Sequence, residues 1–287
     1  MSNQNRLPRA AALHDLSCVG RCALTVILPT LAAMGIQPIP LPTALLSTHT
    51  GGFTDLFFAD LTDEMEKIAA HWKTLSLDFD AIYTGFLGSA PQIDTVSRFI
   101  GEFGEGALIL VDPVMGDDGL LYSTYTPEMV NRVRELCAHA DLITPNLTEA
   151  CLLCGLPYRD TAELSAPEVR DFADELLDRL SHLDAPAVLL TGLPHGGVIS
   201  VAGSVEGDRF CFSHERVSAG YPGTGDLFAS VLLGRLLRQR GKLTADRLQT
   251  AADFAAHFTG RAIAHTLAAG TPVRDGVLLE ALLGELI

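Results

Sequence analysis

The chain is predicted to adopt an α/β fold, a three-layer α/β/α sandwich around a mostly parallel sheet. Short apolar segments rich in Val, Ile and Leu alternate with amphipathic segments, which is the pattern of a parallel sheet covered by helices. Recognisable helix starts stand between these segments, and the last quarter of the chain has apolar residues at helical spacing. The expected strands cover residues 10–14, 39–46, 81–84, 107–111, 142–144 and 187–191.

Two further strands are expected over residues 197–202 and 209–214. They lie so close together in the sequence that we expect an antiparallel hairpin near one edge of the sheet. Ser89 and Ser165 each begin a segment with the form of a capping box and a Pro in the first turn. Thr126, which is followed by a Pro, is predicted to open another helix in the same way.

The C-terminal quarter is predicted to be helical, with one helix beginning near Asp226 and another over residues 244–268. No Gly/Ser-rich or Pro-rich linker, repeat or low-complexity tract interrupts the chain. We therefore expect a single domain over residues 1–287, in which residues 1–9 form a disordered N-terminal tail.

Composition and charge exclude several classes of function. Of the 287 residues, 48% are hydrophobic and 19% charged, which favours a folded core over disorder. The net charge of −15 argues against non-specific binding to nucleic acid or to an anionic membrane. No apolar run approaches the roughly 20 residues needed to span a bilayer. The six dispersed cysteines and the polar N-terminus, without a signal-peptide pattern, lead us to expect a cytoplasmic protein.

Three polar residues come directly after or at the end of predicted core strands. Asp112 follows one strand, Asn146 follows the next, and Thr191 ends a third. Ligands of open α/β sheets bind outside the carboxyl ends of the strands, so these residues are expected to face one crevice. Asp112 and Asn146 could equally start turns or cap helices. The Asn-Leu-Thr-Glu segment that ends at Glu149 is consistent with a helix cap and with two oxygen ligands for a hydrated Mg²⁺.

The segment 220–226 reads Gly-Tyr-Pro-Gly-Thr-Gly-Asp and precedes an amphipathic helix. Gly223 and Gly225 allow positive φ and close backbone approach, and a helix start presents unpaired N–H groups. This combination suits an anion such as a transferring phosphoryl group. Asp226 is then placed to accept a proton from an attacking hydroxyl, and we expect the helix start to keep it ionised. The alternative is that Asp226 only caps the helix.

Six segments, in order along the chain, resemble the pyridoxal kinase branch of the ribokinase-like fold. Six ordered matches are much more specific than any one of them, and together they cover roughly residues 10–270. The chain has no P-loop, dinucleotide fingerprint or nucleophile elbow that would point elsewhere. The matching segments are residues 14–17 (HDLS), 47–51 (STHTG), 83–86 (YTGF), 112–117 (DPVMGD), 144–149 (TPNLTE) and 223–226 (GTGD).

The resemblance implies a kinase that uses ATP and Mg²⁺, commonly as a homodimer, to phosphorylate the hydroxymethyl group of pyridoxal, pyridoxamine or pyridoxine in vitamin B6 salvage. It implies that Asp226 is the general base and that Gly223, Thr224 and Gly225 bind the transferring phosphoryl group. Further implied roles are nucleotide binding by Asp112, Asn146, Glu149 and Thr191, Mg²⁺ binding through water by Asn146 and Glu149, and contacts with the substrate ring by Asp15, Thr43, His49 and Phe86.

Three positions depart from the family pattern. Members often have Ser where Asp15 stands, Tyr where Phe86 stands, and Asn where Arg21 stands. Asp15 makes the site more similar to hydroxymethylpyrimidine kinase, because a carboxylate can pair with a ring nitrogen or an amino group. Hydroxymethylpyrimidine or another small alcohol therefore stays open as the substrate. A non-catalytic B6-binding protein on this fold is the alternative from another class, although such a protein would not need Asp226.

Overall fold

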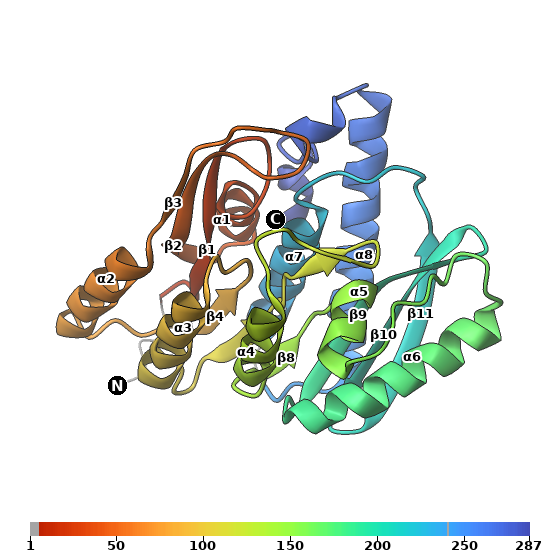
Figure 1. Cartoon of the computed structure of the whole chain (residues 1–287), viewed down its shortest axis with the longest axis horizontal. Helices are drawn as coiled ribbons and strands as arrows, with labels where there is room; N and C mark the ends of the chain where they lie inside the picture. The colour runs from red at the N-terminus through yellow and green to blue at the C-terminus, as the bar shows by residue number, and fades with distance from the viewer. Residues whose placement is uncertain (1–5, 240) are drawn as a thin grey trace.

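A computed structural model describes residues 6–239 and 241–287, and its centre is a nine-stranded sheet (Figure 1). The strand order is β11-β10-β9-β8-β5-β4-β1-β2-β3. Neighbours from β9 to β2 are parallel, while β10, β11 and β3 add antiparallel pairs at the two edges. The strands are β1 (Arg9–Val19), β2 (Gln37–Thr48), β3 (Phe58–Asp60), β4 (Ala81–Thr84), β5 (Leu108–Val111), β8 (Leu142–Ile143), β9 (Ala187–His195), β10 (Val198–Val205) and β11 (Asp208–Glu215).

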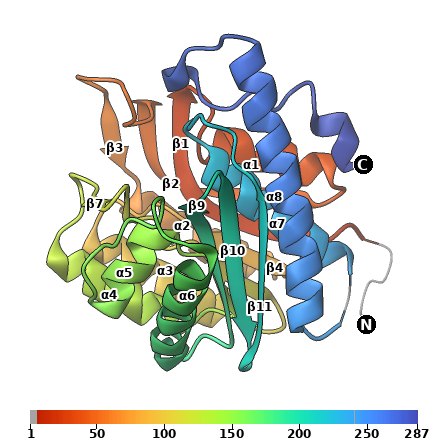
Figure 2. The ribbon, with the colours of Figure 1, turned by 90° about the vertical axis from the view of Figure 1, so that its right-hand side faces the viewer.

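Helices cover both faces of the sheet, which makes the three layers (Figure 2). One face carries α2 (Thr62–Thr74), α3 (Ala90–Phe103), α4 (Pro127–Cys137), α5 (Leu147–Cys154) and α6 (Ala166–Leu180). The other face carries α1 (Leu24–Ala33), α7 (Thr224–Arg238) and α8 (Ala245–Ala268). Short 3-10 helices lie at Ser181–Leu183, Val273–Asp275 and Leu283–Leu286, and a small hairpin is formed by β6 (Gly116–Asp117) and β7 (Leu120–Leu121).

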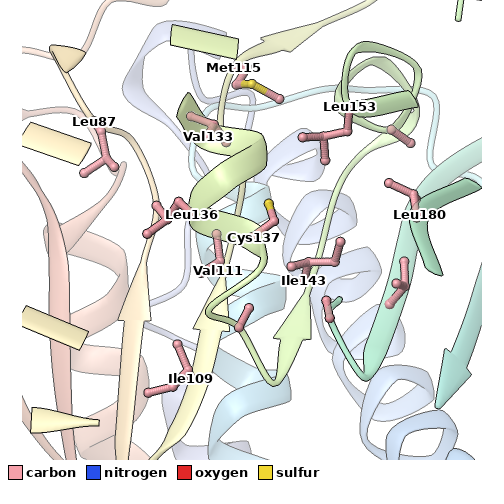
Figure 3. Close-up of a cluster of buried hydrophobic side chains, with 14 of the residues drawn as sticks. Leu87, Ile109, Val111, Met115, Val133, Leu136, Cys137, Ile143, Leu153 and Leu180 are labelled. Atoms are coloured by element: carbon pink, nitrogen blue, oxygen red, sulfur yellow. The ribbon is translucent and has the colours of Figure 1, made fainter. Parts of the chain in front are cut away.

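Each face of the sheet has its own hydrophobic core, because side chains alternate along a strand. In β5, Ile109 and Val111 pack against α3 and α4 (Figure 3), whereas Leu110 packs into the core beneath α7 and α8. Burying both faces explains why the central strands are continuous apolar runs. The carboxyl ends of the parallel strands from β2 to β9 lie along one edge of this sheet.

The predicted fold class is confirmed, and each predicted strand is present within a few residues. The β10–β11 hairpin at the sheet edge and the two C-terminal helices are also as predicted. The strands β3, β6 and β7, which are only two or three residues long, were not predicted. A signal for β6–β7 was available, because Asp118 and Gly119 both have positive φ and Asp-Gly is the preferred sequence of a two-residue hairpin turn.

Two local predictions were wrong. Residues 1–5 lie outside the described part of the chain, but residues 6–9 belong to the fold, since Arg6 bonds to Asp80 and Arg9 begins β1. Ser89 does not form a capping box with Gln92. Gln92 instead accepts a hydrogen bond from the Gly88 amide (2.8 Å) and donates one to the Thr43 carbonyl (2.7 Å). The buried amide therefore joins α3 to the middle of β2.

Candidate active site

Three of the predicted site residues, Asp112, Asn146 and Thr191, lie on or just beyond neighbouring strands of the parallel sheet. Asp112 follows β5 directly, and its Oδ1 accepts a hydrogen bond from the Thr144 hydroxyl (3.1 Å) just beyond β8. Asn146 forms an isolated bridge with Thr191, which lies in the middle of β9 rather than at its end. Three neighbouring strands thus bring Asp112, Asn146 and Thr191 to one edge.

The Gly-Thr-Gly-Asp segment forms the start of α7. Gly223 is the residue before the helix, with φ of 82°, and a Cβ atom there would lie 2.3 Å from the Arg21 carbonyl oxygen. Gly225, by contrast, has no positive φ, and a Cβ atom there would meet nothing within 4 Å. Packing within the protein therefore explains why residue 223 is a glycine, but it does not explain the glycine at position 225. The open space beside Gly225, in the first helical turn with its unpaired N–H groups, is suited to an anion.

Asp226 does not cap its own helix. It is the third helical residue of α7, and no side-chain cap bond is formed at this helix start. Its Oδ2 instead accepts a hydrogen bond from the backbone N–H of Ala23 (2.8 Å), the residue that precedes α1. The same oxygen lies 3.6 Å from the Cys22 sulfur. The capping alternative is therefore wrong for α7, and Asp226 lies between the starts of two helices.

Burial controls the acid–base properties of this edge. Desolvation raises the pKa of Asp226, while the contacts with Ala23 and Cys22 lower it in part. The expectation that the helix start would favour the ionised form thus omitted the larger effect. Burial raises the pKa of Asp112 to about 7, with a further contribution from the charge of Asp226. The pKa of Asp15 rises to about 6 by burial, although the hydrogen bond from Ser17 opposes it.

Asn146 and Glu149 form a complete capping box at the start of α5. The Asn146 side-chain oxygen accepts from the Glu149 amide (2.9 Å), and Glu149 Oε2 accepts from the Asn146 amide (2.8 Å). Glu149 Oε1 also accepts from the Met115 amide (3.2 Å). Burial raises the pKa of Glu149 well above its usual value, and the charge of Asp112 adds to this. The cap is thus real, but it holds a carboxyl group that is 3% exposed.

Two buried carboxyl groups that lie near each other repel when both are ionised, and a divalent cation between them would relieve this repulsion. Asp112 and Glu149 are such a pair. The Asn146 oxygen is already used in the cap, so it fits a metal less well than predicted. In residues 6–239 and 241–287, no three His, Cys, Asp or Glu side chains are grouped to hold a metal ion. This arrangement fits Mg²⁺ held largely through water, because Mg²⁺ dehydrates reluctantly.

Two of the residues expected to face a substrate ring, Thr43 and Phe86, contact each other, and Asp15 lies on β1, which pairs with the strand of Thr43. Asp15 lies in β1 where the register against β2 shifts between His14 and Leu16, and such a bulge re-aims a side chain. The Asp15 carboxylate accepts a hydrogen bond from Ser17 (2.8 Å). Thr43 in β2 donates its hydroxyl to the carbonyl of Phe86 (3.3 Å), so the predicted ring contacts from β2 and from the end of β4 are joined.

His49 differs from the expectation, because backbone groups occupy both of its ring nitrogens. Nδ1 accepts from the Gly51 amide (3.1 Å), and Nε2 lies 2.7 Å from the Arg274 carbonyl oxygen. This fixes the proton on Nε2. The ring also packs against Gly20, where a Cβ atom would lie 2.4 Å from it. His49 thus ties the loop after β2 to the C-terminal segment and has no ring nitrogen free for a substrate.

Sequence reasoning missed three residues around Asp226: His14, Cys22 and Ala23. His14 is 1% exposed, and its Nδ1 lies 4.0 Å from Asp226 Oδ1. Burial lowers the pKa of His14 to about 3, so the ring is neutral. Cys22 and Ala23 follow the early Val-Gly segment, whose position directly after the first strand was the available signal. Arg21, noted as a departure, points away and pairs with Glu280 (2.7 Å).

Comparisons with known proteins show which proteins this chain resembles. A family model described as phosphomethylpyrimidine kinase matches residues 27–275. A Bacteroides thetaiotaomicron structure, described provisionally as a phosphomethylpyrimidine kinase, is 42% identical with a TM-score of 0.90, and the match covers 100% of this chain and 96% of that one. A second crystal form of that protein is described as containing pyridoxal. The pyridoxal kinase of Lactobacillus plantarum is 33% identical with a TM-score of 0.84, covering 98% and 96% of the two chains.

A curated relative is much longer than this chain. The thiamine biosynthesis multifunctional protein of Corynebacterium glutamicum is 28% identical over 174 residues, which are 60% of this chain but 22% of that protein. The match therefore concerns about a fifth of that protein.

No helix in the described residues is both long enough and apolar enough to cross a membrane.

Proposed function

The chain belongs to the phosphomethylpyrimidine kinase family, and on this premise we propose that it phosphorylates the hydroxymethyl group of a vitamin B6 ring with ATP. That it is a phosphotransferase follows from the family and from its pyridoxal kinase relatives. The observation that carries the proposal is the start of α7. Free N–H groups beside Gly225 and the carboxylate of Asp226 meet there, as phosphoryl transfer to an alcohol requires.

In the proposed reaction, the substrate hydroxyl attacks the γ-phosphorus of ATP while its proton moves to Asp226. A new O–P bond forms, the bond to the β-phosphate oxygen breaks, and ADP leaves. The N–H groups of Thr224 and Gly225 bind the oxygens of the transferring group, where negative charge is spread. Asp112 and Glu149 would hold Mg²⁺ through water, and the ion would neutralise the phosphates. The raised pKa of Asp226 makes it a stronger proton acceptor.

Of the two candidate substrates, we place a pyridine of the B6 type first. The reason is that one relative matching nearly the whole chain is described with bound pyridoxal and another is described as a pyridoxal kinase. Asp15 would face the ring nitrogen or an amino substituent, and Thr43 and Phe86 would line the ring. We place hydroxymethylpyrimidine second, because the family description and the carboxylate of Asp15 both allow an aminopyrimidine. A purely binding role is disfavoured, since desolvation of the Asp226 carboxylate opposes its ionisation and a protein that only binds the ring would not need a proton acceptor there.

The test is ATP consumption by the purified protein with pyridoxal, pyridoxamine, pyridoxine and hydroxymethylpyrimidine, each in the presence and absence of Mg²⁺. We expect turnover with at least one B6 vitamer and a much lower kcat/KM with hydroxymethylpyrimidine. The Asp226→Asn variant measures background hydrolysis. Preference for hydroxymethylpyrimidine would reverse the order of the two candidates. Binding of a vitamer without ADP production in any mixture would leave the binding-protein alternative.

We also propose that the protein works as a homodimer, on the basis of the family resemblance. Sedimentation at micromolar concentration should give about twice the chain mass of 30.6 kDa. A monomer at that concentration, with full activity, would remove this part of the proposal without affecting the reaction.

A further inference from the structure

The loop of residues 20–23 between β1 and α1 packs directly against the start of α7. A Cβ atom on Gly223 would lie 2.3 Å from the Arg21 carbonyl oxygen, so backbone meets backbone there. Ala23 has φ of 50°, a left-handed conformation that costs free energy for a residue with a side chain. In this conformation its N–H donates to Asp226 Oδ2. The loop is thus held in a strained shape that serves Asp226.

The side chain of Cys22 belongs to the same contact. Its sulfur lies 3.6 Å from Asp226 Oδ2, within hydrogen-bond distance for a thiol. The side chain of Thr25 fixes the backbone of Cys22 on both sides, since its hydroxyl accepts from the Cys22 amide (3.1 Å) and donates to the Cys22 carbonyl (2.8 Å). Burial and the negative charges of Asp226 and Asp15 raise the pKa of Cys22 well above its usual value, so the thiol stays protonated.

A thiol that stays protonated is a hydrogen-bond donor and a poor nucleophile. The two carboxylate oxygens of Asp226 are therefore not equivalent. Oδ2 receives the Ala23 N–H and faces the Cys22 thiol, whereas Oδ1 has no hydrogen-bond donor among the described residues and lies 4.0 Å from His14. Oδ1, which accepts no hydrogen bond from these residues, is therefore the more available oxygen for a proton that leaves the substrate.

We propose that Cys22 is a positioning residue for phosphoryl transfer, whose thiol holds Asp226 Oδ2 together with the Ala23 amide and leaves Oδ1 as the proton-accepting oxygen. This inference rests on the proposed function. Cys22 does not touch the reacting atoms, so it acts through the orientation and basicity of Asp226. Removing the thiol removes a donor that favours the carboxylate, and the carboxyl group would then hold its proton to higher pH.

The other groups that act on Asp226 are unchanged by such a substitution. They are His14 and Asp15 from β1, Asp112 beyond β5, and the Tyr83 phenol from β4. His14 is neutral and Tyr83 is kept protonated by burial, so both have the same charge across the pH range of an assay. Asp15 and Asp112 titrate near pH 6 and pH 7, but both are present in the wild type and in every Cys22 variant. Only the difference between their pH profiles is therefore assigned to the lost thiol.

The experiment compares pH–rate profiles of Cys22→Ala, Cys22→Ser and Cys18→Ala, the last removing an exposed cysteine near the end of β1. For Cys22→Ala we expect kcat to fall roughly fivefold to tenfold, and the acidic limb of kcat to move up by about half to one pH unit, as for a lost donor to a carboxylate. Cys22→Ser keeps a donor on a shorter side chain and should recover at least half of this shift. Cys18→Ala should match the wild type.

An infrared measurement tests the contact without catalysis. The S–H stretching band of Cys22, identified by subtracting the Cys22→Ala spectrum, should move to higher frequency in Asp226→Asn, because the amide group is a weaker acceptor. An unchanged band, or equal pH profiles for all Cys22 variants, would overturn the inference even if the wild type is fully active. If the wild type phosphorylates nothing, the proposed function fails while the band shift is still expected. If Cys22→Ala does not fold, Cys22→Ser supplies both the pH profile and the spectrum that is subtracted to identify the Cys22 band.

Discussion

At the scale of single residues, the site is a group of carboxylates whose ionisation is controlled by desolvation. Burial is the largest cause of the raised pKa of Asp15, Asp112, Glu149 and Asp226. The pattern of polar and apolar residues in the sequence does not give the pKa of a carboxyl group, because this pKa depends on which atoms cover the side chain. Each of these carboxylates is held by at least one hydrogen bond, so burial does not leave it without a partner.

Replacing Asp226 with Asn should lower kcat by a factor of about 10²–10⁴, the usual contribution of a general base. Asn is nearly the same size and can still accept the Ala23 N–H, so the fold and ATP affinity should change little. The measurement is kcat together with the nucleotide Kd by calorimetry. A variant with near-normal turnover would show that the proton goes to another group.

Replacing Asp15 with Asn should raise KM for pyridoxamine by roughly tenfold relative to pyridoxine, since a hydrogen-bonded charge is typically worth ~1.5–3 kcal/mol. With a pKa of about 6, Asp15 gains its charge as the pH rises through 6. The wild-type KM for pyridoxamine should therefore fall between pH 5.5 and 7.5, and the variant should lose this dependence. Pyridoxine serves as the internal control. Equal losses on both substrates would mean that Asp15 does not contact the substituent.

At the scale of secondary-structure elements, helix starts do most of the positioning. The start of α7 presents its N–H groups, the residue before α1 donates to Asp226, and the start of α5 holds Glu149 by a capping box.

Glu149→Gln should raise the Mg²⁺ concentration required for half-maximal activity several-fold, because Gln has no carboxyl proton to lose when the ion binds and supplies no negative charge beside it. Gln also serves in a capping box, and the carboxyl of Glu149 already favours its neutral form, so the melting temperature should change little. Glu168→Gln, in the exposed capping box of α6, is the matched control and should leave the Mg²⁺ requirement unchanged. Early melting of Glu149→Gln with a normal Mg²⁺ requirement would mean that Glu149 is only a cap.

Ala23→Gly should raise the free energy of unfolding by about 1 kcal/mol, because glycine adopts the φ of 50° at Ala23 without strain. The exposed Ala32 within α1 provides a control of opposite sign, since Ala32→Gly should cost about 1 kcal/mol of helix stability. Chemical denaturation of the two variants gives both values. Destabilisation by Ala23→Gly would mean that the loop gains more from restriction of the unfolded chain than it loses by strain.

At the scale of the whole molecule, one nine-stranded sheet with a core on each face joins the N-terminal and C-terminal parts of the chain. We propose on this basis that the chain functions as one domain. The proposed site lowers stability, because the sheet edge that forms it also buries carboxyl groups. The stability of the ligand-free protein should therefore depend on pH.

Asp112 has a folded-state pKa of about 7, above its ordinary value of 3.8. The folded state thus holds this proton more tightly than the unfolded state, and the resulting stability is lost as the pH rises from about 4 through 7. Asp112→Asn should therefore melt several degrees above the wild type at pH 8 and near it at pH 4, while its activity falls. Asp171→Asn, an exposed carboxylate of α6, is the control. A constant difference at both pH values would argue against a buried charge at Asp112.

The sequence by itself was sufficient for the fold class, the central strands, the edge hairpin and the C-terminal helices. Strong hydrophobic periodicity and turn chemistry are local properties, and they agree here with the final packing. The Gly-Thr-Gly-Asp segment also predicted the start of α7, where we propose the anion site, because a glycine turn before a helix has a direct physical meaning. The strands β3, β6 and β7 were missed since two or three residues show no period.

Only the tertiary structure decided what each side chain of the site contacts. His49 binds backbone groups through both ring nitrogens, Asn146 uses its oxygen in a cap, and Asp226 bonds to the residue before another helix. These partners lie up to 225 residues apart in the chain, beyond any local pattern. The direction of the Asp226 pKa shift was likewise decided by burial, which depends on how the loop of residues 20–23 and α7 close over the carboxylate. Local sequence determines which elements form, whereas their packing determines the solvent and hydrogen-bond partners of each charged group.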